Sequence, residues 1–296
     1  MANNNKNILE VKNLNKEYNS FKLKDINLSL PKGMIMGLIG ENGAGKTTTI
    51  KSILNLTSID SGEINIFGMD MKEEAKKIKE DIGVVLDDSF LSEHLTPKDI
   101  NQIMKNIYSN WDEDLFLEYL KDFKLPLKQE SKDFSSGMKV KLKIAIAISH
   151  YPKLLILDEP TSGLDPVARS EILDIFQDFI QDGESSILVS SHITSDLEHI
   201  ADYITFINDG KILLSKTRDE LLEQFGIVRC SKEDFEKIEE NDYEKYKINK
   251  YEYDVLVSNK KEFKRKYDFK VIDKPTLDDI MSVSYTHLTL PTILRV

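Results

Sequence analysis

Short apolar stretches alternate with amphipathic stretches along the first two thirds of the chain. Alternating apolar and polar positions at 8–14 and 23–30 predict strands with one buried face. Mostly apolar runs, typical of buried parallel strands, occur at 34–39, 82–86, 154–157, 187–190 and 204–208. Helical patterns lie between them at 48–56, 72–81, 167–181 and 196–201. This order predicts an α/β fold with a mostly parallel sheet covered by helices on both faces.

Three further regions depart from that alternation. The N-terminal strands predict an antiparallel β portion, and residues 88–150 predict a helical subdomain interrupted at Pro97 and Pro126. The sequence Asn208-Asp209-Gly210-Lys211 is a hairpin signal. Beyond Lys216 the chain becomes rich in Lys, Glu, Asp and Tyr. We therefore expect one domain over 1–216 and a small C-terminal extension over 217–282.

The last residues, 283–296, are expected to be a non-native tail. Residues 283–292 read Val-Ser-Tyr-Thr-His-Leu-Thr-Leu-Pro-Thr. This stretch resembles the translation of a transposase adapter used in sequencing libraries. A natural tail is the alternative interpretation.

Composition narrows the class of protein. The net charge of -11 and the pI near 5.1 argue against a broad nucleic-acid footprint, which needs clustered basic residues. Cys230 has no second cysteine with which to form an intramolecular disulfide, as suits a reducing compartment. The sequence contains no secretory signal pattern and no apolar run of the ~20 residues that span a bilayer. We therefore expect contact with a membrane only through a partner.

A phosphate-binding loop follows the apolar run at 34–39. The sequence Gly40-x-x-x-x-Gly45-Lys46-Thr47 comes after a predicted strand and opens a predicted helix. Glycines let successive backbone N–H groups face phosphate oxygens, and the helix N-terminus adds positive potential. Lys46 would reach the β- and γ-phosphates and Thr47 would ligate Mg²⁺. A glycine-rich turn that binds nothing is the alternative, which the strand–loop–helix context disfavours.

Two adjacent acids end another predicted buried strand, Leu154-Leu155-Ile156-Leu157-Asp158-Glu159. Neighbouring side chains on a strand point in different directions. Asp158 is therefore expected to hold the Mg²⁺ shell while Glu159 polarises the attacking water as general base. Ligands of open α/β sheets bind at the carboxyl ends of strands, so this pair and the phosphate loop are expected to meet.

The order of these motifs resembles ABC ATPases over residues 8–215. Phe134-Ser135-Ser136-Gly137-Met138 precedes the acidic pair, Pro160-Thr161-Ser162-Gly163-Leu164-Asp165-Pro166 follows it, and Ser190-Ser191-His192 follows the next strand. The resemblance implies a RecA-like P-loop NTPase fold with the antiparallel portion, the helical subdomain and the C-terminal extension described above. It also implies ATP and Mg²⁺ as ligands.

The resemblance assigns roles to individual positions. Tyr18 matches the aromatic residue that stacks on adenine, and His192 matches the switch histidine at the γ-phosphate. Asp165 lies in the D-loop, and Ser135, Ser136 and Gly137 form the signature loop that closes on the nucleotide of the other subunit. The Walker A loop includes Gly40, Asn42, Gly43, Ala44, Gly45, Lys46, Thr47 and Thr48.

Two positions depart from the family pattern. The signature usually reads Leu-Ser-Gly-Gly-Gln, whereas Phe134, Ser136 and Met138 stand here. Asp87 stands where the family usually has glutamine, and it could approach Mg²⁺ or a water. Both departures resemble the ATPase subunits of Gram-positive multidrug or peptide-antibiotic exporters.

The functional expectation is the ATPase motor of an ABC transporter that powers export by ATP-driven dimer closure. The resemblance implies a separate transmembrane permease and a second ATPase subunit, identical or different, with the chain at the cytoplasmic face of the membrane. No nucleic-acid partner is expected. The alternative is a non-transport ABC ATPase acting in DNA repair or translation. A P-loop kinase or GTPase is a third, more distant alternative. A GTPase would need an Asn-Lys-x-Asp motif to recognise guanine, whereas Asn15-Lys16-Glu17-Tyr18 lacks the Asp and precedes the phosphate loop.

Overall fold

The computed structural model describes residues 6–86, 92–249, 252–267 and 272–285. The chain divides into two compact units, Met1–Ile212 and Leu213–Val296. In the described part of the chain, no helix has both the length and the apolar character needed to cross a bilayer.

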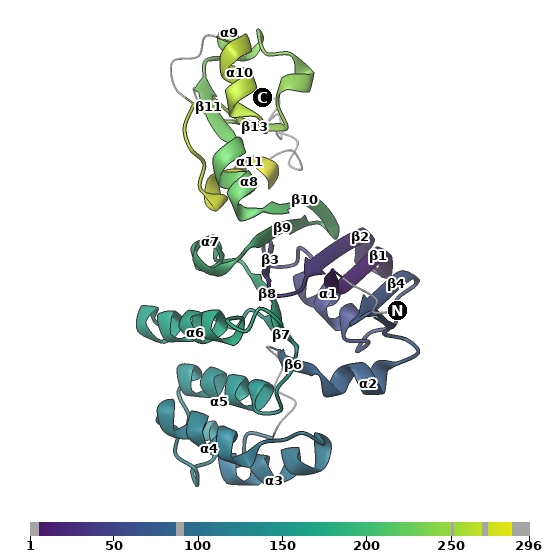
Figure 1. Cartoon of the computed structure of the whole chain (residues 1–296). Helices are drawn as coiled ribbons and strands as arrows, with labels where there is room; N and C mark the ends of the chain where they lie inside the picture. Colours follow the sequence, from purple (N-terminus) through teal and green to yellow (C-terminus); the bar gives the residue numbers. More distant parts are fainter. Residues whose placement is uncertain (1–5, 87–91, 250–251, 268–271, 286–296) are drawn as a thin grey trace. The chain divides into compact units, whose positions relative to one another are not determined.

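A six-stranded sheet forms the centre of the first unit (Figure 1). Its strand order is β10-β9-β3-β8-β7-β6, and β3 pairs in parallel with β8 and β9, as β7 does with β6 and β8. Every residue of β3, β7 and β8 is buried, which explains why β3 and β7 are apolar almost throughout; β8 also buries three serines. The strands are β3 (Ile35–Ile39), β6 (Ile82–Val85), β7 (Leu154–Asp158), β8 (Ser186–Ser191), β9 (Tyr203–Asn208) and β10 (Lys211–Thr217).

The two faces of this sheet have different covers. Figure 1 shows α5, α6 and α7 on one face, and α1 with a four-stranded antiparallel sheet on the other. The antiparallel sheet has the order β2-β1-β4-β5. The elements are α1 (Lys46–Ile53), α2 (Ala75–Glu80), α5 (Ser136–Ile148), α6 (Pro166–Phe179), α7 (Thr194–Ile200), β1 (Asn7–Tyr18), β2 (Phe21–Pro31), β4 (Ser61–Ile66) and β5 (Met69–Asp70).

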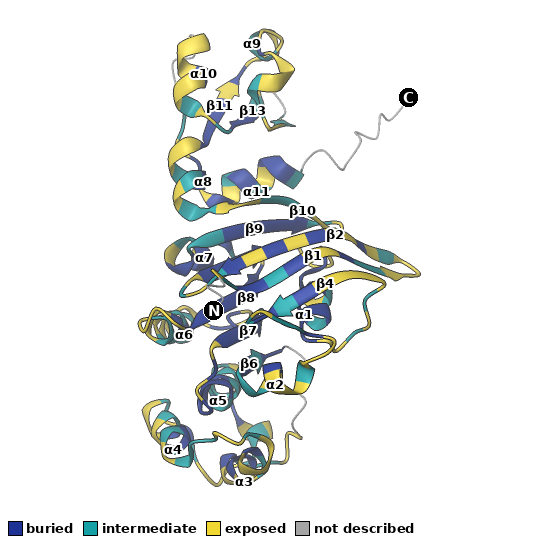
Figure 2. Ribbon diagram, turned by 45° about the vertical axis from the view of Figure 1, so that its right-hand side comes forward, coloured by how far each residue is buried: buried dark blue, intermediate teal, exposed yellow. Residues whose placement is uncertain are grey.

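One apolar core joins the antiparallel sheet, α1 and the parallel sheet. Met36 and Leu38 of β3 and Leu154 and Ile156 of β7 project into it, as alternation along each strand requires. Figure 2 shows these central strands in the colour of buried residues. The carboxyl ends of β3 and β7 are therefore held on a rigid base.

Helices α3 (Pro97–Ile107) and α4 (Glu113–Asp122), with the turn η1 (Ser131–Asp133), pack with α5 around a separate small core. Side chains define where these helices begin. Thr96 forms a capping box with Asp99, and Pro97 occupies the first turn of α3. Asp112 caps α4, and Ser135 caps α5 by accepting the Met138 N–H.

The second unit contains a three-stranded sheet of order β11-β13-β12. Its core includes Val228, Val255 and Phe263. Burial raises the pKa of the Cys230 thiol to about 11, so this group is protonated at neutral pH. The elements are α8 (Arg218–Gln224), β11 (Gly226–Cys230), α9 (Lys232–Phe235), η2 (Glu240–Asp242), β12 (Lys245–Ile248), β13 (Tyr253–Val257), α10 (Lys260–Lys266) and α11 (Leu277–Tyr285).

The α/β class, the mostly parallel sheet and the antiparallel portion are confirmed, and several element bounds differ from the expectation. The first strand runs to Tyr18 rather than ending at residue 14, and the helix after the phosphate loop spans Lys46–Ile53 rather than 48–56. The unit boundary falls after Ile212, within β10. The first three residues of the expected non-native tail, 283–285, belong to α11, and Val283 is buried. The remaining residues, 286–296, lie outside the described residues.

Gly83 allows β6 to pack closely against α5. A Cβ at Gly83 would lie 2.3 Å from the Ala147 backbone oxygen and 2.4 Å from Leu155 Cδ2. We expect Gly83→Ala to lower the free energy of unfolding by roughly 1–3 kcal/mol, because the backbone of α5 must shift. Urea denaturation measures this change.

Gly137→Ala is the matched control for Gly83→Ala. A Cβ at Gly137 would lie 3.5 Å from Ala168 Cβ, which is an ordinary contact, and alanine favours the helical conformation of α5. This control should leave stability equal or slightly higher. Equal unfolding midpoints for Gly83→Ala and the unmodified chain would contradict the proposed close packing.

Candidate functional site

The loop between β3 and α1 is built for a curled backbone. Gly43 and Gly45 have φ of 83° and 113°, values that side chains disfavour. A Cβ at Gly45 would also lie 2.9 Å from the side chains of Phe21 and Leu23. Gly45 is the N-cap of α1 and supplies no side-chain cap. The first-turn N–H groups of α1 are thus left to a ligand at the positive end of the helix.

Lys46 is a buried cation held inside this loop. Its side chain is 5% exposed, and its Nζ donates to the backbone oxygens of Gly40 at 2.6 Å and Glu41 at 3.1 Å. The same Nζ lies 3.0 Å from Oε1 of Glu159. A buried ammonium needs such partners, because desolvation disfavours an unpaired charge.

Asp158 is held through both carboxylate oxygens. The Thr47 hydroxyl donates to Oδ2 at 2.7 Å, and the Ser190 hydroxyl donates to Oδ1 at 2.6 Å. Asp158 and Ser190 are register partners in the parallel β7–β8 pair, which places them side by side. The sequence therefore brings α1, β7 and β8 together at one carboxylate.

Glu159 links the side chains of Lys46 and His192. Its Oε2 lies 2.7 Å from Nδ1 of His192, and its Oε1 faces Lys46. Glu159 has a φ of 52°, a left-handed conformation that is uncommon for residues other than glycine. Backbone strain thus coincides with the residue expected to act as general base.

A cavity of about 550 Å³ opens beside this cluster, within the size range of small-molecule and cofactor sites. Tyr18, 44% exposed, stands at its edge at the end of β1. The lining residues are Tyr18, Ser20, Phe21, Asn42, Gly43, Gly45, Lys46, Thr47, Thr48, Asp158 and Glu159. Most residues expected from the two motifs therefore gather in one place, together with Ser20 and Phe21, which sequence reasoning did not select.

The remaining expected residues lie elsewhere. Among the described residues, the lining of this cavity does not include Gly40 and Ala44, which belong to the same loop, or His192, which contacts Glu159. The described lining residues also do not include Ser135, Ser136, Gly137 or Asp165. These residues approach one another at the N-terminal ends of α5 and α6. Asp87, expected near Mg²⁺, lies outside the described residues.

Asp165 has a structural contact of its own. Its carboxylate accepts the N–H groups of Val167 and Ala168, each at 3.0 Å, and so caps α6. The bond from Ala168 lowers the pKa of Asp165. A Cβ at Gly137 would lie 3.5 Å from Ala168 Cβ, so the signature loop and the capped start of α6 are neighbours.

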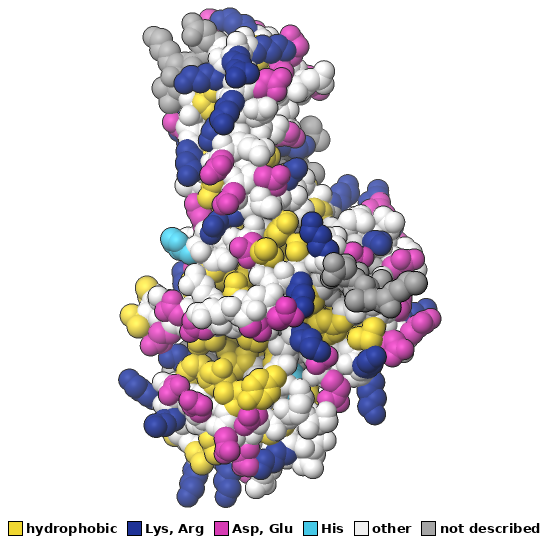
Figure 3. Space-filling view, viewed as in Figure 1, with side chains coloured by type: hydrophobic (Ala, Val, Ile, Leu, Met, Phe, Trp, Pro, Cys, Tyr) yellow, Lys and Arg dark blue, Asp and Glu magenta, His cyan; other side chains and the backbone are white. Residues whose placement is uncertain are grey.

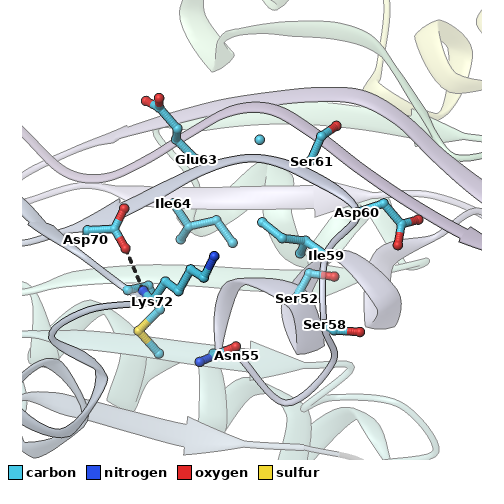
Figure 4. Close-up of a pocket in the computed structure, with 12 residues that line it drawn as sticks. Ser52, Asn55, Ser58, Ile59, Asp60, Ser61, Glu63, Ile64, Asp70 and Lys72 are labelled. Atoms are coloured by element: carbon cyan, nitrogen blue, oxygen red, sulfur yellow. Dashed lines mark hydrogen bonds between the residues drawn. The ribbon is translucent and has the colours of Figure 1, made fainter.

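A second hollow, of about 400 Å³, lies at the opposite end of α1 and shares no lining residue with the first (Figure 4). Figure 4 shows the Asp70 carboxylate accepting the backbone N–H of Lys72. The lining of this hollow contains three acidic residues, Asp60, Glu63 and Asp70, and one basic residue, Lys72. The C-terminal end of a helix also carries negative potential. A triphosphate is therefore favoured in the cavity at the Lys46 end.

Ser190 stands in the motif Ser190-Ser191-His192, but sequence reasoning gave it no role. Its hydroxyl bonds to Asp158 and accepts the backbone N–H of Glu159 at 3.0 Å. The parallel pairing of β7 with β8 would have been the signal, because a register with Leu154 opposite Ser186 sets Ser190 beside Asp158.

The chain matches known proteins across the first unit. A family model described as ABC transporter matches residues 23–162. The lantibiotic transport ATP-binding protein SrtF of Streptococcus pyogenes is 39% identical over 215 residues, covering 72% of this chain and 92% of that protein. The bacitracin transport ATP-binding protein BcrA of Bacillus licheniformis is 38% identical, covering 70% of this chain and 68% of that protein.

Solved structures agree with these relatives. An ATP-binding subunit of an ABC transporter superposes with a TM-score of 0.66 at 30% identity, covering 72% of this chain and 91% of that one. A nucleotide-free ATP-binding cassette, 21% identical, shares the fold with a TM-score of 0.60 and covers 71% of this chain and 91% of that one. The expected ATPase of a transporter is confirmed, and the DNA-repair or translation alternative gains no support. The chain belongs to the ABC transporter family, as an ATP-binding, ATP-hydrolysing subunit.

Proposed function

We propose that ATP binds with Mg²⁺ in the 550 Å³ cavity and that hydrolysis there drives export through a separate permease. The observation that carries the proposal is the convergence of Lys46, the Thr47–Asp158 pair and Glu159 on one cavity, with His192 in contact with Glu159. Curled backbone amides, a helix N-terminus and a buried lysine together suit a polyphosphate.

The donor set beside the phosphate loop fits magnesium. Mg²⁺ prefers hard oxygen ligands and is held by one or two protein groups together with substrate phosphates. The Thr47 hydroxyl and the Asp158 carboxylate, 2.7 Å apart, are such groups. When bound, the ion would neutralise charge on the phosphates. Asp87 is proposed as a further contributor from the sequence alone.

Glu159 is proposed as the general base. Its carboxylate now occupies donors, Lys46 and His192, that we assign to the γ-phosphate. A phosphate bound by those groups competes with the carboxylate for them, and a released carboxylate can accept a proton from water. Lys46 and His192 would then stabilise the developing charge on the transferred group.

We propose that a second ATPase subunit, identical or different, completes the nucleotide-binding site. Ser135, Ser136 and Gly137 stand at the N-terminus of α5, a suitable place for an anion, and lie apart from this chain's own cavity. Asp165 neighbours them through Ala168. Figure 3 shows hydrophobic side chains gathered over the α5 and α6 region, which supports coverage by partners.

The transported substrate is proposed from the relatives. Those named above are lantibiotic and bacitracin transport ATP-binding proteins. A peptide antibiotic moved outward is therefore the substrate class that we propose. The chain would act at the cytoplasmic face of the membrane, bound to its permease.

Glu159→Gln tests the assigned base. We expect ATP hydrolysis to fall by roughly 100-fold or more, because an amide cannot accept the proton, while ATP binding persists. Closed dimers should accumulate with ATP. Phosphate release, nucleotide titration and size-exclusion chromatography measure these effects.

Glu184→Gln is the matched control for the base, because Glu184 pairs with Lys32 on the surface. It should retain normal turnover. Normal turnover in Glu159→Gln would instead remove Glu159 from the proposed mechanism.

Tyr18→Ala tests the adenine platform. A base stacked on an aromatic ring gains about 1–3 kcal/mol, so ATP affinity should fall about tenfold. Tyr18→Phe keeps the ring and should stay within about twofold of the unmodified chain. Competition with a fluorescent nucleotide gives both affinities, and equal affinity in Tyr18→Ala would place adenine elsewhere.

Membrane fractionation tests the permease partner. In cells that express the tagged chain with its neighbouring genes, we expect it to sediment with membranes. Deletion of the neighbouring gene that encodes a protein with apolar membrane-spanning segments should release the tagged chain from the membranes. Sedimentation unchanged by that deletion, or no sedimentation with the gene present, would count against the proposed permease contact.

A further inference from the structure

We propose that Ser190 is a positioning residue that couples the magnesium site to the catalytic carboxylate. The inference rests on the proposed roles of Asp158 and Glu159 and assigns a role to a serine that the motifs left without one. Ser190 is completely buried near the C-terminal end of β8. One hydroxyl there contacts both of the adjacent acids.

The direction of the Ser190 proton follows from its neighbours. A hydroxyl has one proton to donate, and the Glu159 N–H already donates to this oxygen at 3.0 Å. The Ser190 proton is therefore directed to Oδ1 of Asp158, 2.6 Å away, which is the usual length of a charge-assisted bond.

This bond fixes the plane of the Asp158 carboxylate. The terminal torsion of an aspartate has a broad energy minimum, so backbone position alone does not orient its oxygens. With Thr47 bonded to Oδ2 and Ser190 to Oδ1, rotation of the carboxylate would break both bonds. Lone pairs remain on each oxygen for the metal shell.

The same residue holds the backbone of Glu159. The Glu159 N–H approaches both the hydroxyl of Ser190 and its backbone oxygen, the latter at 3.2 Å. This occurs where β7 ends and Glu159 enters its left-handed conformation. Displacement of Ser190 would thus disturb metal orientation and the base together.

Ser190→Ala tests the coupling, with Ser190→Thr as the variant that keeps the hydroxyl. The probes are Mn²⁺, measured by electron paramagnetic resonance with a non-hydrolysable ATP analogue, and the same analogue alone in EDTA. Loss of an outer-shell partner typically costs 10–100-fold in metal affinity or activity. We expect Ser190→Ala to weaken Mn²⁺ binding about tenfold, to leave metal-free nucleotide affinity within about twofold, and to lower kcat. Ser190→Thr should restore Mn²⁺ affinity.

Ser186→Ala is the matched control for a merely structural effect. Ser186 is also completely buried in β8, and its hydroxyl accepts the Gly33 N–H at 2.9 Å, away from the cavity. It should keep normal Mn²⁺ affinity. If Ser190→Ala does not fold, Ser190→Cys replaces it, because a thiol is similar in size to a hydroxyl but is a weak donor. Ser190→Cys should weaken Mn²⁺ binding in the same way.

The outcomes separate the two proposals. Normal Mn²⁺ affinity in Ser190→Ala, with loss in Asp158→Ala, would overturn the role of Ser190 alone. Normal Mn²⁺ affinity in both variants would overturn the assignment of Asp158 to the metal. Equal weakening in Ser186→Ala would also overturn the positioning role.

Discussion

A buried ammonium group organises this site. Lys46 is almost fully enclosed, and its charge is balanced by two loop carbonyls and by Glu159. Breaking such a set by removing one partner is costly, because the remaining charge stays buried. The curled loop, the end of β7 and the start of α1 are therefore fixed relative to one another by a single electrostatic requirement.

The parallel sheet brings the other groups of the proposed site next to Lys46. β3 delivers the loop, β7 delivers the two acids, and β8 delivers Ser190 and leads to His192. Because the strands are parallel, their carboxyl ends meet at one edge. The groups that we propose to face a second subunit, by contrast, begin α5 and α6 and lie outside this edge. On that proposal, this sheet provides one rigid half of the site and the second subunit provides the other half.

Local sequence predicted the residues whose role depends on local geometry. The Gly40–Thr47 loop needs only a strand, glycines and a helix, and Asp158 and Glu159 need only a strand end. Phe21 was not selected because its approach to Gly45 joins segments that are apart in the sequence. Ser190 received no role because its contact with Asp158 depends on the pairing of β7 with β8. The earlier start of α1 has a local cause, because Gly45 turns the chain directly before Lys46. The unit boundary within β10 has no comparable local signal.

The left-handed backbone conformation of Glu159 implies a conflict between folding stability and the proposed catalytic role of this residue. Glycine would relax that conformation, since it adopts positive φ without steric cost. The substitution that best suits the backbone at this position thus removes the carboxylate that we propose as the general base. Strained residues of this kind persist in active sites because function retains them. Screens for heat-resistant variants of this subunit should therefore be paired with a turnover assay, or they will enrich folded but inactive chains.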